Sequence, residues 1–339
     1  MATDLARPGR GLDSVAMSAR AYALRLDPWS ADYDASIQLP SEVDAEAPLP
    51  RVETDVEGAW RALRPPAGAP PRLCLIDGVR RIEHRLLVEQ GERVHFGLLG
   101  SLAVGAVEVA DEARIATARV ARVICVGGGL EVEALVAPVA GSRFELAFAP
   151  EIVAENTPAA PLQGLQNAMR RREAELAVEC AATGESLVLL DGPLGFLTVY
   201  DAPVVGYVKR LLRPYLDAEA FALVPALEVG ERTPLFLLPE LERYSWYLRI
   251  GRGRVIDAAL AGIVRLEVPS ALALDTAVGL ADATAAALPR LASDHTRDPR
   301  APQNLLPVGA LETELRRRLG DVLLVRRAVE ARLHAEATA

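Results

Sequence analysis

The hydrophobic and polar positions first form a regular pattern near residue 72, and the pattern there is typical of strands. The apolar run RLCLID at 72–77 is closed by Asp77-Gly78, and residues 80–90 then alternate between polar and apolar. After a turn at EQGER, an apolar run returns at 94–109, and a further one lies near 119–128. Alternation with a period of two marks half-buried strands. We therefore predict a largely antiparallel meander that opens with a buried central strand.

Helices and strands are mixed in the rest of the chain. The segment at roughly 162–182, rich in Arg, Glu and Ala, predicts a helix that ends before Gly184. Strand-like segments follow, and they are SLVLLDG, GFLTVYD, VVGYVKRL, PLFLLP, YSWYLRIG and GIVRLEVP. Two more helices are predicted near 271–291 and 308–336. Strands followed by mixed helices and strands indicate an α/β or α+β layer fold.

Three regions are expected along the chain. Residues 1–70 are a leader with short helical patterns at 14–26 and 56–63, and the proline-rich PPAGAPP is typical of a stiff connector. Residues 71–320 form the main domain, and residues 321–339 form a helical tail.

Composition and charge narrow the classes of protein. Hydrophobic residues make up 51% of the chain and charged residues 24%, so a sizeable core is available. The net charge of −9, from 37 basic and 46 acidic residues, argues against a surface coated in positive charge for non-specific nucleic-acid binding. A local basic stripe would still suffice for phosphate contact.

Cysteine usage and hydropathy point to a cytoplasmic protein. Cys74, Cys125 and Cys180 stand singly without CxxC spacing, which argues against a disulfide framework and a zinc knuckle. The first residues hold no apolar stretch long enough for a signal peptide, and charges interrupt the alanine-rich segments before about 18 residues. No membrane span is expected.

Two Asp-Gly dipeptides that follow matched apolar runs are the first candidates for chemistry. Asp77 ends LCLI and Asp191 ends LVLL. An aspartate at the carboxyl end of a buried strand points into the crevice above the sheet edge. Two such carboxylates would repel each other unless a divalent cation lay between them, and Mg²⁺ and Mn²⁺ prefer oxygen ligands. The alternative is that each Asp-Gly is a plain turn, since it is among the commonest turn dipeptides.

A carboxylate from the predicted helix could join them. Glu173 and Glu175 lie on the helix that leads into the second of these strands. They are about 200° apart around the helix, so only one can face the sheet. The alternative is a solvated helix face with Arg–Glu pairs.

Six short motifs follow one another between residues 70 and 320. They are IDGVRRIE at 76–83, LLDGPL at 189–194, GYVKR at 206–210, YSWYLRI at 244–250, RLEVP at 265–269 and DPRAPQNLLPVGALE at 298–312. In this order they resemble the motifs of NurA-domain nucleases, particularly those of the bacterial branch. The ordered set, rather than any single motif, is the specific feature.

The resemblance implies a ribonuclease H-like core and Mn²⁺-dependent (or Mg²⁺-dependent) cleavage of DNA, as a 5′–3′ exonuclease and single-strand endonuclease. It also implies a homodimer that works with a HerA-type hexameric translocase in end resection and double-strand break repair. Carried over to this sequence, the metal ligands are Asp77, Asp191 and Glu173, with Glu175 as second choice for the helix position.

The carboxyl-terminal motif departs from the family pattern. The family usually places a histidine there, whereas this sequence has Val308 and Gly309. His295 lies upstream and is a candidate replacement, the alternative being a surface histidine in a charged loop. The aromatic contributor that the resemblance implies would be Tyr247 or Tyr244.

Basic residues beside the two Asp-Gly sites are candidates for DNA contact. Lys209 is expected to hold a phosphate oxygen as a point charge. Arg80, Arg81 and Arg210 are expected to line a channel with it, the alternative being scattered solvent-facing charges.

Two other functions are compatible with the sequence. A protein with the nuclease fold that has lost activity would serve as an adaptor for a translocase, and the missing histidine motivates this interpretation. A different metal-dependent phosphoesterase would use the same aspartates on a small substrate. The chain has no Walker A motif, so any ATP would have to be hydrolysed by a partner.

Overall fold

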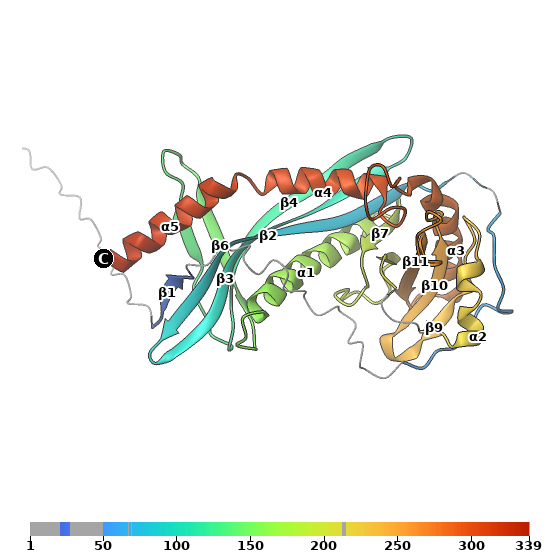
Figure 1. Ribbon diagram of the computed structural model, residues 1–339, viewed down its shortest axis with the longest axis horizontal. Coiled ribbons are helices and arrows are strands. Elements are labelled where there is room, and N and C mark those ends of the chain that lie inside the picture. The colour runs from blue at the N-terminus through green and yellow to red at the C-terminus, as the bar shows by residue number, and fades with distance from the viewer. Residues whose placement is uncertain (1–20, 28–49, 67, 69, 212–214, 339) are drawn as a thin grey trace, which may run out of the picture.

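The computed structural model describes residues 21–27, 50–66, 68, 70–211 and 215–338, and its longest strands form an antiparallel pair (Figure 1). These are β2 (Leu73–Gln90) and β3 (Arg93–Val109). β4 (Ala113–Val126) continues the antiparallel meander. The predicted meander with a buried first strand is therefore present.

β2 passes straight through the Asp77-Gly78 dipeptide, so the predicted strand end at Asp77 is wrong. On one side, Asp77 pairs with Gly105 and Gly78 with Val104, and this ladder to β3 continues past them. On the other side, the parallel ladder to β7 (Leu187–Asp191) stops at Ile76. Asp77 thus lies inside its strand, next to the point where the pairing with β7 ends.

One mixed sheet of eleven strands organises the described residues in the order β5-β6-β4-β3-β2-β7-β8-β11-β10-β9, with β1 paired to β2. The strands not yet given are β1 (Ala23–Leu26), β5 (Leu135–Pro138), β6 (Glu145–Ile152), β8 (Val204–Val208), β9 (Phe236–Leu238), β10 (Arg243–Arg249) and β11 (Ile263–Pro269). The pairs β2–β7, β7–β8 and β4–β6 are parallel and the others antiparallel. This confirms the predicted α/β class with a mixed, largely antiparallel sheet. The central order β4-β3-β2-β7-β8, a meander followed by two strands parallel to its first, is the ribonuclease H-like arrangement.

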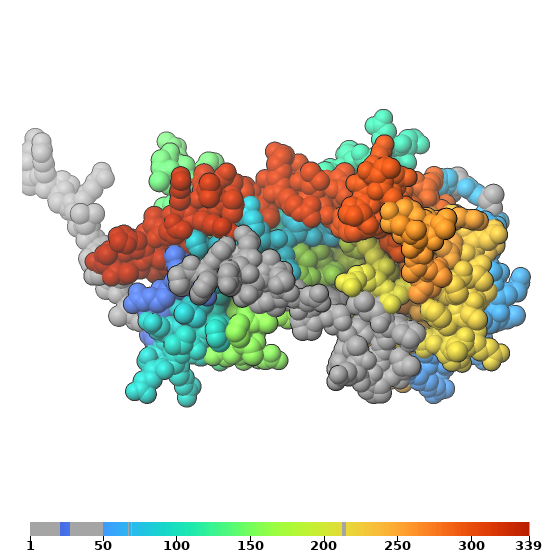
Figure 2. Space-filling model, in the orientation of Figure 1, coloured from blue at the N-terminus to red at the C-terminus, as the bar shows by residue number. Residues whose placement is uncertain are grey.

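Helices cover both faces of the sheet (Figure 1). α1 (Ala160–Ala182) packs on one face of β2, β3 and β7, where it buries Leu165 and Ala168 against Cys74 and Ile76. α4 (Leu306–Arg318) and α3 (Leu274–Ala287) cover the other face. α5 (Val322–Thr338) continues from α4 along the meander, and in Figure 2 the two form a ridge along one side of the molecule. The remaining short helices are α2 (Ala218–Phe221), η1 (Val224–Ala226), η2 (Pro239–Leu241) and η3 (Leu288–Leu291).

The alternation of side chains along β2 decides which helix each one meets. Leu73, Leu75 and Val79 belong to the core under α3 and α4, whereas Cys74 and Ile76 belong to the core under α1. Asp77 therefore projects on the α4 side and Gly78 on the α1 side.

Several predicted elements differ from the structure. The helix expected at 308–336 is broken at Gly320, whose φ of 82° ends α4 in the left-handed conformation. GFLTVYD is an irregular loop, not a strand. The short strands β5 and β6 were not predicted.

The helix expected at 56–63 is also wrong, because this segment consists of bends followed by an isolated bridge. Leu63 forms an isolated bridge with Arg232, and the ring of Trp60 packs at 6.3 Å from the ring of Phe236. In the 14–26 segment, residues 23–26 form β1, and residues 14–20 lie outside the described part of the chain. Long-range pairing has overridden the local helical pattern at both places.

Nothing in the described part of the chain is a helix both long and apolar enough to cross a membrane.

The packing of α1 on the sheet gives a first prediction. A methyl group added at Gly100 on β3 would lie 2.6 and 2.7 Å from the two Cδ atoms of buried Leu165. We expect Gly100→Ala to lower the free energy of unfolding by about 1–3 kcal/mol in the wild type. In a Leu165→Ala background the obstructing atoms are gone, so the same substitution should cost much less. Urea unfolding of the four proteins of this double-mutant cycle measures the coupling, and equal costs in both backgrounds would contradict the packing.

Candidate active site

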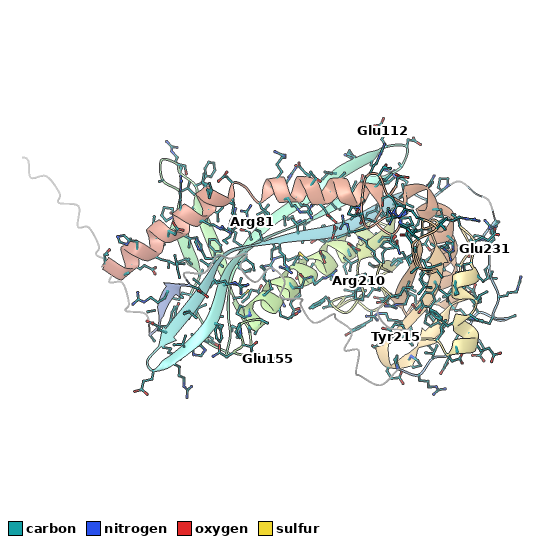
Figure 3. The ribbon with its side chains drawn as sticks, in the orientation of Figure 1. Arg81, Glu112, Glu155, Arg210, Tyr215 and Glu231 are labelled. Atoms are coloured by element: carbon teal, nitrogen blue, oxygen red, sulfur yellow. The ribbon has the colours of Figure 1, made fainter. Side chains whose placement is uncertain are left out.

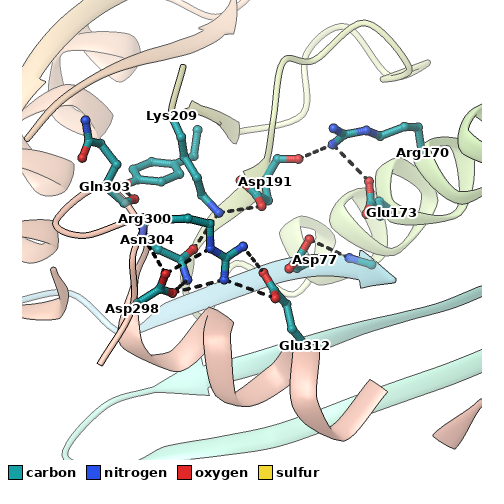
Figure 4. A network of polar contacts seen from close by, with 12 residues as sticks. Asp77, Arg170, Glu173, Asp191, Lys209, Asp298, Arg300, Gln303, Asn304 and Glu312 are labelled. Atoms are coloured by element: carbon teal, nitrogen blue, oxygen red, sulfur yellow. Dashed lines mark hydrogen bonds and ion pairs between the residues drawn. The ribbon is translucent and has the colours of Figure 1, made fainter. Parts of the chain in front are cut away.

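Asp77 and Asp191 occupy matching positions on neighbouring parallel strands. The ladder between β2 and β7 ends with the pair Ile76–Leu190, and each aspartate is the next residue of its strand. Side chains alternate in step along paired strands, so both carboxylates project from the same face. Figure 4 shows them facing a common space.

Glu173 approaches Asp77 from α1, which covers the opposite face of the sheet. Its side chain is buried and points at Gly78, where an added methyl group would overlap Glu173 Oε1 and lie 2.9 Å from Met169 Cγ. Gly78 therefore leaves the room that the Glu173 carboxylate occupies. Glu175, two residues on, is exposed, as helix geometry requires.

Arg170 on α1 binds the second Asp-Gly site in a similar way. Its guanidinium donates to the backbone oxygen of Asp191 and, at 3.4 Å, to Glu173 Oε2. A methyl group at Gly192 would lie 2.5 Å from Arg170 Nη1, and Gly192 has a φ of 109°. Both Asp-Gly glycines are thus places where a charged side chain of α1 comes against the sheet.

Lys209 connects Asp191 to the carboxyl-terminal motif. Its ammonium group donates to Asp191 Oδ2 at 2.8 Å and to Asn304 Oδ1 at 2.9 Å. Asn304 is buried and donates in turn to Asp298 Oδ2 at 2.6 Å. Arg300 binds Asp298 and also pairs at 2.9 Å with Glu312 of α4. Residues from both halves of the chain therefore form one polar network (Figure 4).

Negative charge accumulates at Asp77. Burial, and then the nearby carboxylates of Asp191 and Glu173, raise the pKa of Asp77 well above its usual value, while the Lys209 ammonium acts in the opposite direction. Glu312 raises the pKa of Asp77 further. The only hydrogen bond given to the Asp77 carboxylate by the described residues comes from the Gly78 N–H, at 2.8 Å. An added cation would be well placed to offset this charge.

The donor set fits a hard divalent cation in its chemistry. The carboxylates of Asp77, Glu173 and Asp191 and the amide oxygen of Asn304 are the oxygen ligands that Mg²⁺ and Mn²⁺ prefer. Within the described residues, no three carboxylate, imidazole or thiolate groups stand together in positions that would hold a metal ion. Lys209 and Arg170 each engage part of the set, so ligation would require these side chains to rotate.

The predicted histidine and tyrosine make their contacts away from this network. His295 lies 3.7 Å from Asp257 of the β10–β11 loop. Tyr247 is fully buried in a separate apolar cluster, stacked on Phe236 with ring centroids 5.7 Å apart. Tyr244 is half-buried on the other face of β10, and its backbone pairs with Val268.

The four predicted DNA-binding residues are not gathered at one place. Arg80 faces α1 and donates to Gln166 Oε1 at 2.6 Å, whereas Arg81 projects on the α4 side. Arg81 pairs with Glu83 and donates to the carbonyl of Gly320 at the end of α4. Arg210 is exposed, and it lies well apart from Arg81 in Figure 3. Of the four, Lys209 alone bonds to the acidic residues of the network.

Sequence reasoning missed Arg170, Tyr207, Asn304 and Glu312. Tyr207 is the buried aromatic residue of the site, and its hydroxyl donates to the Gln303 carbonyl at 2.7 Å. Burial, followed by Asp191, raises the pKa of Tyr207 well above its usual value. Tyr207, Asn304 and Glu312 lie within two of the six motifs, so attention to all the polar positions there, rather than to a histidine alone, would have found them.

Comparisons with known proteins found a similarity of structure and none of sequence. Models of protein families and curated proteins give no match to the sequence. Among solved structures, the chain is similar to the NurA nuclease from Sulfolobus solfataricus, at 12% sequence identity over 82% of this chain and 88% of that chain, with a TM-score of 0.43.

The role of Gly78 gives a prediction with a matched control. Gly78→Ala should lower stability by about 1–3 kcal/mol, because the methyl group displaces the buried Glu173 carboxylate. Gly195→Ala is the control, since a methyl group there would meet nothing within 4 Å. Thermal unfolding in EDTA measures both variants. In a Glu173→Ala background, Gly78→Ala should cost much less stability than it does in the wild type. An equal cost in both backgrounds would show that the methyl group clashes elsewhere.

Asp298 gives a prediction about pH. Burial acts to raise its pKa, but hydrogen bonds from Arg300 and Asn304 outweigh burial and lower the pKa of Asp298 from 3.8 to about 2. A lowered pKa means that the stabilisation is present above 3.8 and is lost as the pH falls toward 2. Asp298→Asn should therefore be less stable than the wild type at pH 6. The difference in free energy of unfolding, measured in urea, should shrink between pH 4 and pH 3, and a constant difference would argue against this pairing.

Proposed function

We propose that this protein is a divalent-metal-dependent nuclease that hydrolyses phosphodiester bonds in DNA. The proposal is supported by one observation: Asp77 and Asp191 project from matching positions of two parallel strands, and Glu173 of α1 lies near enough to raise the pKa of Asp77. Carboxylates that raise the pKa of Asp77 are costly to bury together, and divalent cations would offset that cost.

The residues of the site would have different roles in the reaction. Asp77, Asp191 and Glu173 would hold the ions, and bound ions of this kind activate water and stabilise the departing oxygen. Lys209 would donate to a phosphate oxygen of the substrate, since its ammonium group already bonds to Asp191 and Asn304 at the site. Asn304, held by Asp298, would keep Lys209 at the site when a bound ion displaces it from Asp191.

DNA as the substrate is supported by the order of the sequence motifs. IDGVRRIE, LLDGPL, GYVKR and DPRAPQNLLPVGALE contain Asp77, Asp191, Lys209 and Asn304, which are residues of the site. Their resemblance to the NurA-domain motifs, including the bacterial branch, is the reason for preferring DNA over a small phosphate ester.

The assembly and pathway belong to the same proposal. We infer a homodimer that acts with a HerA-like translocase, as a 5′–3′ exonuclease and single-strand endonuclease in end resection. Size-exclusion chromatography with light scattering tests the dimer. Cleavage of 5′-labelled and 3′-labelled strands tests the polarity.

An inactive adaptor for a translocase is the second candidate. Two observations favour it: no three ligand groups stand ready for a metal within the described residues, and Val308 and Gly309 occupy the place of the expected histidine. Gly309 lies beside the polar network, since a methyl group there would lie 3.7 Å from Asn304 Nδ2. An adaptor would show no Mn²⁺-dependent rise in melting temperature.

Substitution of the acidic residues separates these functions. We expect Asp77→Asn and Glu173→Gln to reduce Mn²⁺-dependent DNA cleavage more than about 100-fold, because each removes a charged ligand. Glu175→Gln, an exposed change two residues from Glu173 on the same helix, is the matched control and should cleave normally. In EDTA, Asp77→Asn should melt at or above the wild-type temperature, since it removes charge repulsion.

The readouts distinguish failure of the site from failure of the substrate assignment. Mn²⁺ should raise the melting temperature of the wild type and of Glu175→Gln but not of Asp77→Asn. A thermal shift without DNA cleavage, together with hydrolysis of nucleotides or phosphate esters, would point to a different phosphoesterase. Wild-type cleavage by both site variants would refute the site.

A further inference from the structure

The turn that follows Asp191 is held by charged side chains from two strands further along the sheet. Leu194 donates its backbone N–H to Glu267 Oε1 on β11, at 2.8 Å. The carbonyl of Leu194 accepts from Arg243 Nη2 on β10, at 3.1 Å. The Leu194 side chain is fully buried in the core under α1. Both backbone groups of Leu194 are thus bound by side chains of acidic or basic residues.

Gly206 opens the path by which Glu267 reaches this turn. β8 lies beside β11, and Gly206 is the register partner of Glu267. A methyl group at Gly206 would lie 3.0 Å from Glu267 Cγ and 2.9 Å from Leu194 Cγ. Because Gly206 has no side chain, the Glu267 side chain crosses β8 and meets the turn.

The Glu267 carboxylate is also half of a buried ion pair. Arg265 and Glu267 are each 4% exposed, and Arg265 Nη1 pairs with Glu267 Oε2. The Arg265 guanidinium also donates to Ser245 Oγ at 3.1 Å and lies over the ring of Tyr215, 4.8 Å from its centre. Apolar residues of similar volume often stabilise a fold as well as a buried ion pair does, or better. Stability alone is therefore a weak reason for this pair.

Leu194 is coupled to Asp191 through a short and stiff segment. Pro193, which lies between them, has a fixed φ, and the N–H of Gly192 donates to the Tyr207 carbonyl at 2.9 Å. Arg170 binds the Asp191 carbonyl from the other side. With so few free torsions, a shift of Leu194 would be carried to the Asp191 carboxylate.

We propose that Glu267, supported by Arg265 and Arg243, is a positioning residue that sets the placement of Asp191. The expected effect of Glu267 on DNA cleavage rests on the proposed nuclease function, whereas its expected effect on the Leu194 turn does not. Glu267 Oε1 accepts from the Leu194 N–H, and Glu267 Oε2 pairs with Arg265. Both oxygens of the carboxylate are therefore held.

The double variant Arg265→Met/Glu267→Leu separates positioning from stability. It removes both charges and keeps an apolar filling but takes the acceptor from the Leu194 N–H, so the melting temperature should fall by no more than the loss of one buried hydrogen bond requires. We expect kcat for Mn²⁺-dependent DNA cleavage to fall at least about 10-fold, with KM for DNA changed less than about 2-fold, since Asp191 would be misplaced. A folded double variant with wild-type kcat would overturn the proposal.

Two further variants cover the case in which the double variant does not fold. Glu267→Gln retains an oxygen for the Leu194 N–H and loses the charge, so its kcat should be intermediate. Ile263→Val, on the same face of β11, is a control for a small loss of core packing and should cleave at the wild-type rate. If Glu267→Gln and Ile263→Val have equal kcat per folded molecule, the proposal fails.

Hydrogen exchange tests the positioning without any assay of activity. The amide of Leu194 should exchange at least about 10-fold faster in the double variant, which removes its acceptor, than in the wild type, with a smaller increase in Glu267→Gln and β10 unchanged. Unchanged exchange at Leu194 would overturn the proposal even in an active enzyme. A wild-type protein that cleaves no DNA would refute the proposed function, and the exchange result would still decide the role of Glu267.

Discussion

The mutual repulsion of Asp77, Asp191 and Glu173 is the constraint around which the centre of this fold is arranged. Burial and the two neighbouring carboxylates raise the pKa of Asp77, and the Lys209 ammonium lowers it. Arg170 engages Glu173 and the Asp191 backbone, and Arg300 engages Asp298 and Glu312. Cationic side chains therefore approach the acidic group from α1, from the residue after β8 and from the carboxyl-terminal loop. Clustered carboxylates and cations with shifted pKa values are typical of functional sites.

Glycine is what brings these charges so near to the sheet. Gly78 and Gly192 admit Glu173 and Arg170 from α1, and Gly206 admits Glu267 from β11. All three lie beside the carboxyl end of β7, where the parallel ladder stops. A sheet built of larger side chains at these positions would hold the polar groups away from one another.

Buried ion pairs hold the irregular segments of the second half of the chain. Arg232, 1% exposed, pairs with Glu57 and Asp282, and this fastens the segment before β2 to the β9–β11 region. Arg265 and Glu267 act on the turn after Asp191. In each case a buried charge binds backbone that belongs to no strand or helix, since the Glu57 carboxylate also accepts from the Leu235 N–H. Such groups satisfy backbone that would otherwise be buried without partners.

The sequence by itself determined the meander, α1 and the α/β class, because periods of two and 3.6 are local properties of the chain. Helical geometry also sufficed to predict that only one of Glu173 and Glu175 can face the sheet. The position of Asp77 inside β2 and the irregular course of residues 56–63 were decided by the tertiary structure. So was the arrival of Asn304 at Lys209, across 95 residues of sequence. Each of these depends on which distant segment lies alongside, and the pairing of distant strands follows from packing the whole core, which no local pattern encodes.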